Sequence, residues 1–476
     1  MTPSSTQEAP CPLPSPDSSK SFWLSEPILL GHRTTEELPA EADVVVVGTG
    51  ITGASALRYL AESGMKLRIV ALDAREVCSG ATGRNGGHLQ PLPYARSPSI
   101  GAFEIEGSNE LASYIHDNSV PCEYRALDAV RSFWTQESVA QILPRVHQLK
   151  KEDPKVGAKI EVVTDDAGLA ALGLQKGCAG ALVNKAAATL WPYKAVTHMV
   201  QSLVESKSIN LQTNTPVDRI SRNGGKWSVQ TRRGSIMATN VILATNAYTS
   251  HLLHDFSPLI VPARGHVTAL IPPQQEQSPP ETLSHSYGLI AHSPNAGKDV
   301  DEDDYLIQRP YAPGPNRKMH LIFGGAHYDS KLTNIGPDAA DDSVVDPDAV
   351  AYLRKSILKA IKVPGDTQGF DELETEYSWS GIQGYSRDNR PWVGEVPGEK
   401  GLFVAAGYSG HGLPNGPLCA KAVVKMILEN KTGQEVVKEG ASPEEYLLTE
   451  ERIKNAMRMP SVVGDDYQGE LLNNVD

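Results

Sequence analysis

The segment Cys78–Pro91, with the sequence CSGATGRNGGHLQP, concentrates side chains that can bind a ligand or titrate. Gly86 and Gly87 have no side chain, so the backbone there can lie close to a flat ring. His88 titrates near neutral pH and can accept or donate a proton. The segment also offers donors that suit a phosphate group, namely Ser79, Arg84 and Asn85. This composition predicts a loop that wraps a phosphate and a planar ring; the alternative is a solvated turn without a ligand.

A second glycine-rich segment lies upstream, in VVVVGTGITGASALRYLAESG. Gly48, Gly50 and Gly53 form the pattern G-x-G-x-x-G between Val44–Val47, a buried strand, and a helix with apolar residues at helical spacing. The first turn of that helix would bind a pyrophosphate through its unpaired N–H groups. Asp73 follows the next strand, where its carboxylate can accept hydrogen bonds from ribose hydroxyls. This βαβ unit predicts a dinucleotide site, which also includes Ile51, Thr52 and Ala74.

A third glycine-rich segment, Gly407–Pro417, has the sequence GYSGHGLPNGP and precedes an apolar helix. The amino-terminus of that helix can stabilise the negative charge that a reduced flavin carries at its pyrimidine edge. His411 lies within this turn. The loop after Asp73 stands where an NAD domain usually continues into its next βαβ unit. Both features favour FAD over NAD as the dinucleotide.

These segments need a framework of strands and helices that brings them together. The chain has 476 residues, 40% of them hydrophobic, and can bury a core in two or three lobes. Stretches of mixed helices and short strands occupy about 100–182 and 258–372. Between and after these stretches, strands near 210–248 and a strand, turn and helix near 401–430 return to the first pattern. The order predicts one nucleotide-binding domain that is interrupted by two insertions.

Charge and cysteine content narrow the class of protein. The formal net charge is −13 and basic residues are dispersed, so no basic stripe is present for nucleic acid. The five cysteines are far apart, which argues against disulfides or a metal site and favours a reducing, cytoplasmic location. The first twenty residues are rich in proline and serine and predict a disordered tail. No apolar run is long enough to predict a membrane span.

Taken together, the motifs resemble the FAD-dependent oxidoreductases of the D-amino-acid oxidase type, near the sarcosine oxidase, glycine oxidase and γ-glutamylputrescine oxidase-like members. The resemblance covers about Ala42 to Asn430 and includes the further segments VILATNAY, VPARGHV and DNRPWVG. It implies an α/β fold, with a noncontiguous Rossmann-like FAD-binding domain beside an α+β substrate domain whose antiparallel sheet covers the flavin. We assign 41–99, 183–257 and 373–430 to the FAD-binding domain and 100–182 and 258–372 to the substrate domain. Residues 1–40 form the tail and lead-in segment, and 431–476 form a carboxy-terminal extension.

The resemblance also implies which residues contact FAD. In the first domain segment these are Gly48, Gly50, Ile51, Thr52, Gly53, Asp73, Ala74, Ser79, Arg84, Asn85, Gly86, Gly87 and His88. The backbone of Val217 would bind adenine, and Thr245 lies in the matching segment VILATNAY. The pyrimidine edge of the flavin would be lined by Gly410, His411, Gly412 and Leu413, with Arg390 nearby.

Two departures from the family pattern bear on the chemistry. Sarcosine-oxidase-like members tether the flavin through a cysteine upstream of the position of Asp388, but EYSWSGIQGYSRD contains none. We therefore expect noncovalent FAD, with a histidyl link through His88 as the open alternative. Those members also place a lysine above the flavin to assist oxygen, where this chain has Leu321, Ile322 and Phe323, with Lys318 upstream.

The reaction implied is oxidation of the C–N bond of an amine or amino acid. A neutral amine would pass hydride to flavin N5, and the imine would hydrolyse to a carbonyl compound, with oxygen as the expected acceptor. One alternative is a dehydrogenase that uses a quinone or protein acceptor. Another is a flavin-binding module that turns over nothing.

Three side chains are candidates for catalysis. His88 would orient substrate or accept a proton, unless it only bonds backbone within its loop. His411 would donate a hydrogen bond to the flavin edge. Arg264 would hold a substrate carboxylate through bidentate bonds, unless it forms an ordinary ion pair.

Two further groups could shape the substrate space. Tyr193, Tyr385 and Trp379 are possible cavity walls, although aromatic residues at such positions are usually core. The acidic run Asp301–Asp304 could attract a polyamine-like cation, although such runs are usually solvated.

Overall fold

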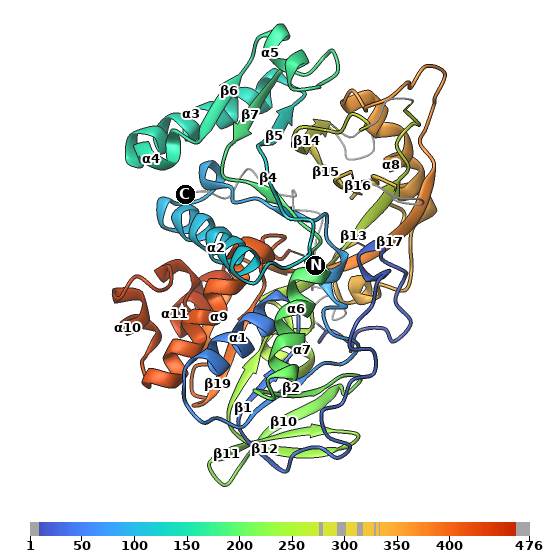
Figure 1. Ribbon diagram of the computed structural model, residues 1–476. Coiled ribbons are helices and arrows are strands. Elements are labelled where there is room, and N and C mark those ends of the chain that lie inside the picture. The colour runs from blue at the N-terminus through green and yellow to red at the C-terminus, as the bar shows by residue number, and fades with distance from the viewer. Residues whose placement is uncertain are drawn as a thin grey trace, which may run out of the picture.

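The computed structural model describes residues 9–275, 279–292, 301–311, 318–327, 330–332 and 334–462. Figure 1 shows two bodies, each built around one large sheet. The lower body in that view holds β1, β2 and β10–β12 with helices α1, α6 and α9, and the upper body holds the second sheet with α3, α5 and α8. The predicted α/β fold, with a dinucleotide-binding half beside a second sheet, is confirmed.

The first sheet has a parallel centre in which β1 lies between β12 and β2, while β9 and β19 extend it on either side. β10 and β11 form an antiparallel hairpin beside β12, and β18 pairs antiparallel with β19. The valines of β1 are buried on both faces, as the continuous β-branched run predicted. The strands are β1 Glu41–Val47, β2 Ile69–Leu72, β9 Asn210–Gln212, β10 Val217–Asn223, β11 Lys226–Thr231, β12 Gly234–Leu243, β18 Trp392–Glu395 and β19 Leu402–Ala406.

Helices α1 Ile51–Glu62, α6 Pro192–Glu205 and α9 Gly412–Glu429 pack together beside this sheet. Ala54, Leu57 and Leu60 of α1 are fully buried, so the helical spacing of apolar residues marks the face that meets α9 and α6. Short helices follow at α10 Gly433–Lys438 and α11 Glu450–Ala456, and α7 spans Thr249–Leu252. None of the described helices is long and apolar enough to cross a membrane.

The second sheet runs in the order β17-β13-β16-β15-β14-β5-β7-β6. Its neighbours are antiparallel except for β14 and β5, which are parallel. Its strands are β5 Ala129–Phe133, β6 Ile160–Val163, β7 Gly180–Asn184, β13 Ile260–Leu270, β14 Ser286–His292, β15 Asp301–Gln308, β16 Leu321–Gly325 and β17 Thr375–Ser386. The helices around it are α3 Gln136–Glu152, α4 Pro154–Gly157, α5 Asp166–Ala171 and α8 Pro347–Ala360, whereas α2 Pro98–Asp117 packs against α9.

A small third sheet joins β3 His88–Leu89, β8 Ala188–Thr189 and β4 Arg125–Ala126. Its strand β3 lies near the end of the loop 78–91 and pairs antiparallel with β8. The first sheet is assembled from three separate stretches of chain, as an interrupted domain requires. β17 falls within the range 373–430 that we assigned to the FAD-binding domain, yet it pairs with β13 in the second sheet.

The amino-terminal segment departs from the expected disordered tail. We call residues 9–20 the N-terminal strap, because they lie against the protein. Cys11 is 1% exposed and its N–H donates to Ser250 Oγ over 2.9 Å. The N–H of Ser19 donates to the carbonyl oxygen of Asp342 over 2.8 Å. Tertiary contacts hold an extended, proline-rich segment that has no helix or strand of its own.

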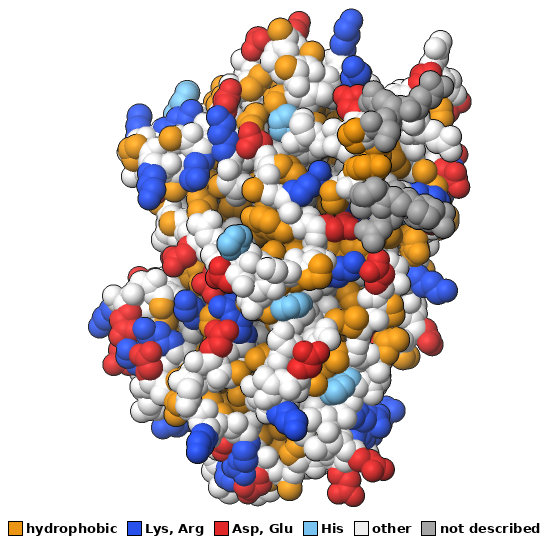
Figure 2. Space-filling view, viewed as in Figure 1, with side chains coloured by type: hydrophobic (Ala, Val, Ile, Leu, Met, Phe, Trp, Pro, Cys, Tyr) orange, Lys and Arg blue, Asp and Glu red, His pale blue; other side chains and the backbone are white. Residues whose placement is uncertain are grey.

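The surface charge agrees with the dispersed pattern of the sequence. Figure 2 shows acidic and basic side chains interspersed over the visible face. All five cysteines are buried as free thiols.

Candidate functional site

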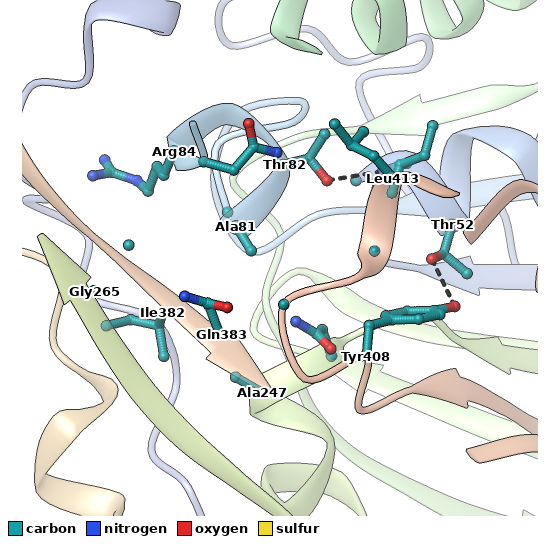
Figure 3. Close-up of a pocket in the computed structure, with 18 of the residues that line it drawn as sticks. Thr52, Ala81, Thr82, Arg84, Ala247, Gly265, Ile382, Gln383, Tyr408 and Leu413 are labelled. Atoms are coloured by element: carbon teal, nitrogen blue, oxygen red, sulfur yellow. Dashed lines mark hydrogen bonds between the residues drawn. The ribbon is translucent and has the colours of Figure 1, made fainter. Parts of the chain in front are cut away.

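A large cavity opens between the two sheets, and every predicted glycine-rich segment contributes to it. The first body supplies the carboxyl ends of β1, β2 and β12, the 3-10 turn η2 Ala81–Arg84 and the turn before α9. The second body supplies one face of its sheet, from β5, β13, β14, β15 and β17. In Figure 3, Ile382 and Gln383 from β17 stand across this space from η2 and from Leu413.

The turn between β1 and α1 uses its three glycines for different purposes. Gly48 has a positive φ of 97°, and a Cβ there would lie 2.6 Å from the carbonyl oxygen of Ala244. A Cβ on Gly53 would lie 1.8 Å from the carbonyl oxygen of Gly48, so Gly53 packs the helix onto the turn and does not line the cavity. Gly50 faces the cavity, where Thr82 Oγ1 is the nearest atom at 3.1 Å. Two of the three predicted contacts therefore lie at the cavity.

Three segments converge at the amino end of α1. The N–H of Ile51 donates to Thr82 Oγ1 in η2 over 3.1 Å. Thr52 Oγ1 donates to the hydroxyl of Tyr408, in the turn before α9, over 2.9 Å (Figure 3). Ile51 and Thr52 both line the cavity, so α1 directs its first turn into it.

Asp73 lies at the end of β2 and lines the cavity beside Ala74. Its carboxylate accepts hydrogen bonds from Thr49 N at 2.8 Å, from Thr49 Oγ1 at 2.5 Å and from Arg75 N at 3.0 Å. Burial raises the pKa of Asp73, and the hydrogen bonds from Thr49 and Arg75 oppose that effect. The carboxylate therefore fixes the glycine turn while it faces the cavity.

Arg84 lines the cavity, but its guanidinium binds protein groups rather than pointing at a ligand. It donates to the carbonyl oxygens of Ser79, at 2.9 Å, and Ser380, at 2.8 Å, and it pairs with Asp342 at 3.1 Å. Burial lowers its pKa to about 10, and Asp342 opposes the shift. Burial of this charge demands protein partners, and these three groups supply them; the predicted contact of Arg84 with FAD stays a prediction.

The glycine pair of the loop is explained by protein side chains. A Cβ on Gly86 would lie 2.5 Å from ring atoms of Tyr305, and one on Gly87 would lie 2.8 Å from Ile307. Gly86 lines the cavity, and Asn85 does too, but Gly87 does not. Gly86 therefore lets the ring of Tyr305, which also packs over Gly324, lie against the loop, and the predicted approach to a flavin ring stays a prediction.

His88 lines the cavity and packs edge-on against Tyr305, with ring centroids 5.7 Å apart. Its Nε2 is buried and has no hydrogen-bond partner among the described residues. Burial lowers the pKa of His88 to about 4, although the backbone of Leu306 and Tyr287 opposes the shift. The imidazole is therefore neutral at physiological pH.

The turn before α9 lines the cavity with Gly410, His411, Gly412 and Leu413. His411 Nδ1 lies 3.5 Å from Oε1 of Glu104, a carboxylate of α2 that is 1% exposed. Burial lowers the pKa of His411 to about 4, and Glu104 opposes the shift. Arg390 does not line this cavity. It borders a small neighbouring pocket that also contains Glu104 and His411.

Several other predicted positions lie away from the cavity. Arg264 donates to the carbonyl oxygens of Asp341, at 3.0 Å, and Asp338, at 3.2 Å, and it is absent from the lining. Its side chain holds the turn η6 Pro337–Ala340 through these two bonds, and the predicted contact with a substrate carboxylate stays a prediction. Trp379 and Tyr193 are core residues, whereas Tyr385 lines the cavity together with Val217 and Thr245. Lys318 pairs with Glu376 at 3.1 Å outside the cavity.

Sequence reasoning missed residues that come from distant parts of the chain. Leu13 and Pro14 of the N-terminal strap line the cavity. On the second sheet, Arg131, Asp303 and Tyr305 line it as well. The acidic run 301–304 gave a signal for Asp303, but Asp304 faces the other side of the strand and accepts a hydrogen bond from Tyr352 at 2.8 Å. The side chains of residues 301 and 302 lie outside the described residues.

The lining has unused polar groups that suit a dinucleotide. Ser79 Oγ, His88 Nε2 and His251 Nε2 are buried, line the cavity and have no hydrogen-bond partner among the described residues. Buried polar atoms without partners are costly in a folded protein and indicate sites for ligand atoms or water. With the glycine turn, Asp73 and the first turn of α1, they fit the predicted FAD.

The family described as FAD dependent oxidoreductase, the DAO family, matches residues 43–426 of the chain. Among curated relatives, probable oxidoreductase OrdL of Haemophilus influenzae is 23% identical over 405 residues, covering 81% of this chain and 83% of that protein. Glycine oxidase of Pseudomonas aeruginosa is 24% identical over 419 residues, covering 83% and 96%. Gamma-glutamylputrescine oxidoreductase of Escherichia coli is 22% identical over 401 residues, covering 81% and 83%.

Among solved structures, glycine oxidase from Geobacillus kaustophilus superposes with a TM-score of 0.65 at 19% identity, over 82% of this chain and 95% of that one. L-proline dehydrogenase from P. horikoshii superposes with a TM-score of 0.63 at 19% identity, over 83% and 95%. These similarities establish the shared fold.

Proposed function

This chain belongs to the FAD-dependent oxidoreductases of the DAO family, and from that membership we propose that it oxidises the C–N bond of a small amine or amino acid. The observation that carries the proposal is the single cavity that joins the dinucleotide turn to the face of the second sheet. Two curated relatives have names that specify such chemistry, glycine oxidase and gamma-glutamylputrescine oxidoreductase.

We propose that FAD lies along the first body. The turn at Gly48 and Gly50, with the first turn of α1, would bind the pyrophosphate, and Asp73 would accept hydrogen bonds from ribose. Ser79 Oγ offers a further unused donor, and Val217 would face adenine. When bound, FAD supplies the two-electron acceptor for the carbon next to the amine.

The protein groups near the reacting end are neutral imidazoles and a helix terminus. His411 and the N–H groups of Gly412 and Leu413 stand at the start of α9, where the helix dipole favours negative charge. His88 is uncharged at neutral pH because its pKa is about 4, so it suits hydrogen bonding to an uncharged amine. We propose His88 and His411 as the residues that contact the reacting groups. Arg264 is not part of this proposal, because its guanidinium bonds backbone carbonyl groups away from the cavity lining.

We propose that FAD is held noncovalently. Cys78 and Cys419 are buried and do not line the cavity, so we expect neither thiol to reach the cofactor. His88 is the remaining candidate for a covalent bond. Acid precipitation tests this directly: free FAD in the supernatant supports the proposal, whereas flavin that stays with the precipitated protein contradicts it.

The acceptor has two candidates. Oxygen is the one we propose, because glycine oxidases are among the relatives and structural neighbours. A quinone or protein acceptor is favoured by a specific observation: no lysine lines the described part of the cavity, and the cations there are Arg75, Arg84 and Arg131. Peroxide release that matches amine consumption would support oxygen, and amine turnover only with an added quinone would support the second candidate.

The proposed reaction is tested by adding amines to the purified protein without oxygen and recording the flavin absorbance. Loss of that absorbance together with a carbonyl product supports the function. An unchanged spectrum across primary amines, secondary amines and amino acids contradicts it.

A further inference from the structure

An ion pair forms part of the cavity wall on the second sheet. Arg131 lies on β5 and Asp303 on β15, and both line the cavity. Arg131 Nη2 donates to Asp303 Oδ2 over 2.9 Å. The side chains are 7% and 21% exposed, so both charges are largely removed from bulk water.

This pair leaves most of its hydrogen-bonding capacity unused. A guanidinium has five N–H donors, and Asp303 is the hydrogen-bond acceptor that Arg131 has among the described residues. Among the described residues, Arg131 Nε is buried without a hydrogen-bond partner. The same holds for the buried hydroxyl of Tyr94, which interacts electrostatically with both Arg131 and Asp303. Asp303 Oδ1 accepts no hydrogen bond from the part of the chain that the structure describes.

A purely structural ion pair would not be built in this way. Burying two charges costs several kcal/mol per ion, and the cost is recovered when further hydrogen bonds satisfy the remaining donors and acceptors. Here those further hydrogen bonds are missing, while the open side of the pair faces the cavity. Gly288 on the intervening strand β14 keeps that side free of a side chain, since a Cβ there would lie 3.5 Å from Arg131 Nη1. The geometry points to a ligand that completes the pair.

The charge of the pair restricts that ligand. A lone carboxylate bound to Arg131 would be repelled by Asp303, and a lone ammonium bound to Asp303 would be repelled by Arg131. A group that carries both charges satisfies both residues, with its carboxylate on Arg131 and its ammonium on Asp303 Oδ1. We propose that Arg131 and Asp303 form a subsite for the zwitterionic head group of an amino acid.

The reaction then requires a second nitrogen in the substrate. Oxidation of a C–N bond needs a neutral amine, whereas the carboxylate of Asp303 favours a protonated one. The ammonium at Asp303 is therefore not the nitrogen that reacts. This inference rests on the proposed function and deepens it: the substrate is an amino acid with a further amine, such as a diamino acid.

Three probes separate the two charges of the head group. L-lysine carries the complete zwitterion, ε-aminocaproate lacks its α-ammonium, and cadaverine lacks its carboxylate, while all share the same terminal amine. Their affinities for the FAD-loaded protein are measured by calorimetry without oxygen, and flavin absorbance is recorded in parallel. We expect L-lysine to bind about tenfold or more tightly than either analogue.

Variants of Arg131 and Asp303 test whether this ion pair causes the preference for L-lysine. Asp303→Asn should abolish the advantage of L-lysine over ε-aminocaproate, and Arg131→Gln should abolish its advantage over cadaverine. Each single substitution leaves one buried charge unpaired and can therefore destabilise the fold. The double variant Arg131→Met with Asp303→Leu removes both charges. We expect it to remain folded and to lose both binding preferences. Glu161→Gln is the matched control, because Glu161 pairs with Lys185 at 3.1 Å on the exposed surface of the same sheet.

The outcomes distinguish this inference from the proposed function. Equal affinities for the three probes, no binding of L-lysine, or an unchanged preference in the folded double variant would overturn the subsite. Bleaching of the flavin by cadaverine as efficiently as by L-lysine would keep the proposed function and reject the subsite. Preferred binding of L-lysine without bleaching by any amine would keep the subsite and reject the function.

Discussion

At the scale of single residues, the ring of Tyr305 connects the loop 78–91 to the second sheet. It packs over Gly86 from the loop and over Gly324 from β16, and a Cβ on either glycine would come within 2.5 Å of it. Such a contact cannot be relieved without moving the ring or the backbone, because core packing leaves little free space. Because Gly86 and Gly324 have no side chains, the ring of Tyr305 can occupy its position in the cavity wall.

Gly86→Ala should displace the loop and weaken FAD retention, because its methyl group would overlap the ring of Tyr305. In a Tyr305→Ala background the same substitution should cost much less, because the ring is gone. We expect a coupling of about 1 kcal/mol or more between the two sites in a double-mutant cycle of unfolding free energies. Additive effects would show that Tyr305 is not the reason for the glycine.

His266 makes stability depend on pH. It is 1% exposed, neither ring nitrogen has a partner among the described residues, and burial lowers its pKa to about 4. Because the unfolded state binds a proton near pH 6.5 and the folded state does not, stability is lost as the pH falls from about 6.5 toward 4. Between pH 8 and pH 5 this loss amounts to about 2 kcal/mol for one histidine.

His266→Leu should lose less unfolding free energy than the wild type over the same pH range, as measured by urea denaturation of the holoprotein. Asn223→Gln, in the exposed β10–β11 turn, serves as the control and should follow the wild-type profile. Parallel profiles for the wild type and His266→Leu would contradict the assignment.

At the scale of elements, the N-terminal strap forms part of the cavity wall. Leu13 and Pro14 line the cavity, Cys11 is buried, and the carbonyl oxygen of Ser15 accepts a hydrogen bond from Arg75 at 3.0 Å. The βαβ unit was predictable, because its periodicity and glycines are local. The position of the strap was not, because a segment rich in proline and serine resembles a tail until the surface that it contacts is known.

Removal of residues 1–16 should accelerate FAD loss and lower Tm, because it deletes the strap residues that line the cavity. Removal of residues 1–8 is the control, since it leaves every described contact in place and should retain FAD as the full chain does. The FAD dissociation rate, measured by fluorescence on dilution, provides the test. Equal rates for the two truncations would show that the strap does not hold the cofactor.

At the scale of the whole molecule, the cavity lies where two bodies from interleaved segments meet. The three glycine-rich segments could be predicted to converge, because each follows a strand of the same parallel sheet. The wall opposite could not be predicted. Arg131 and Asp303 are 172 positions apart and meet only because β5, β14 and β15 are neighbours in a largely antiparallel sheet. The partners of Arg84 and Arg264 could not be predicted for a related reason, since Ser380, Asp342 and Asp338 come from other parts of the fold.

Asp342 forms ion pairs with two arginines of the first body, Arg75 and Arg84. Its carboxylate is 1% exposed and pairs with Arg75, at 2.9 Å, and with Arg84, at 3.1 Å. Asp342→Asn should lower the unfolding free energy by about 3–5 kcal/mol, because two buried guanidinium groups lose their counter-ion. The exposed Asp338→Asn in the neighbouring turn is the matched control. A similar Tm for both variants would contradict this role.

The central claim is that the cavity holds FAD and oxidises an amine. It is tested most directly by mixing the FAD-loaded protein with the amine panel under anaerobic conditions and measuring flavin absorbance together with the carbonyl product. We predict that at least one amine bleaches the flavin and yields one carbonyl compound for each flavin reduced. A flavin that dithionite bleaches but no amine does, or bleaching without C–N cleavage, would contradict the claim.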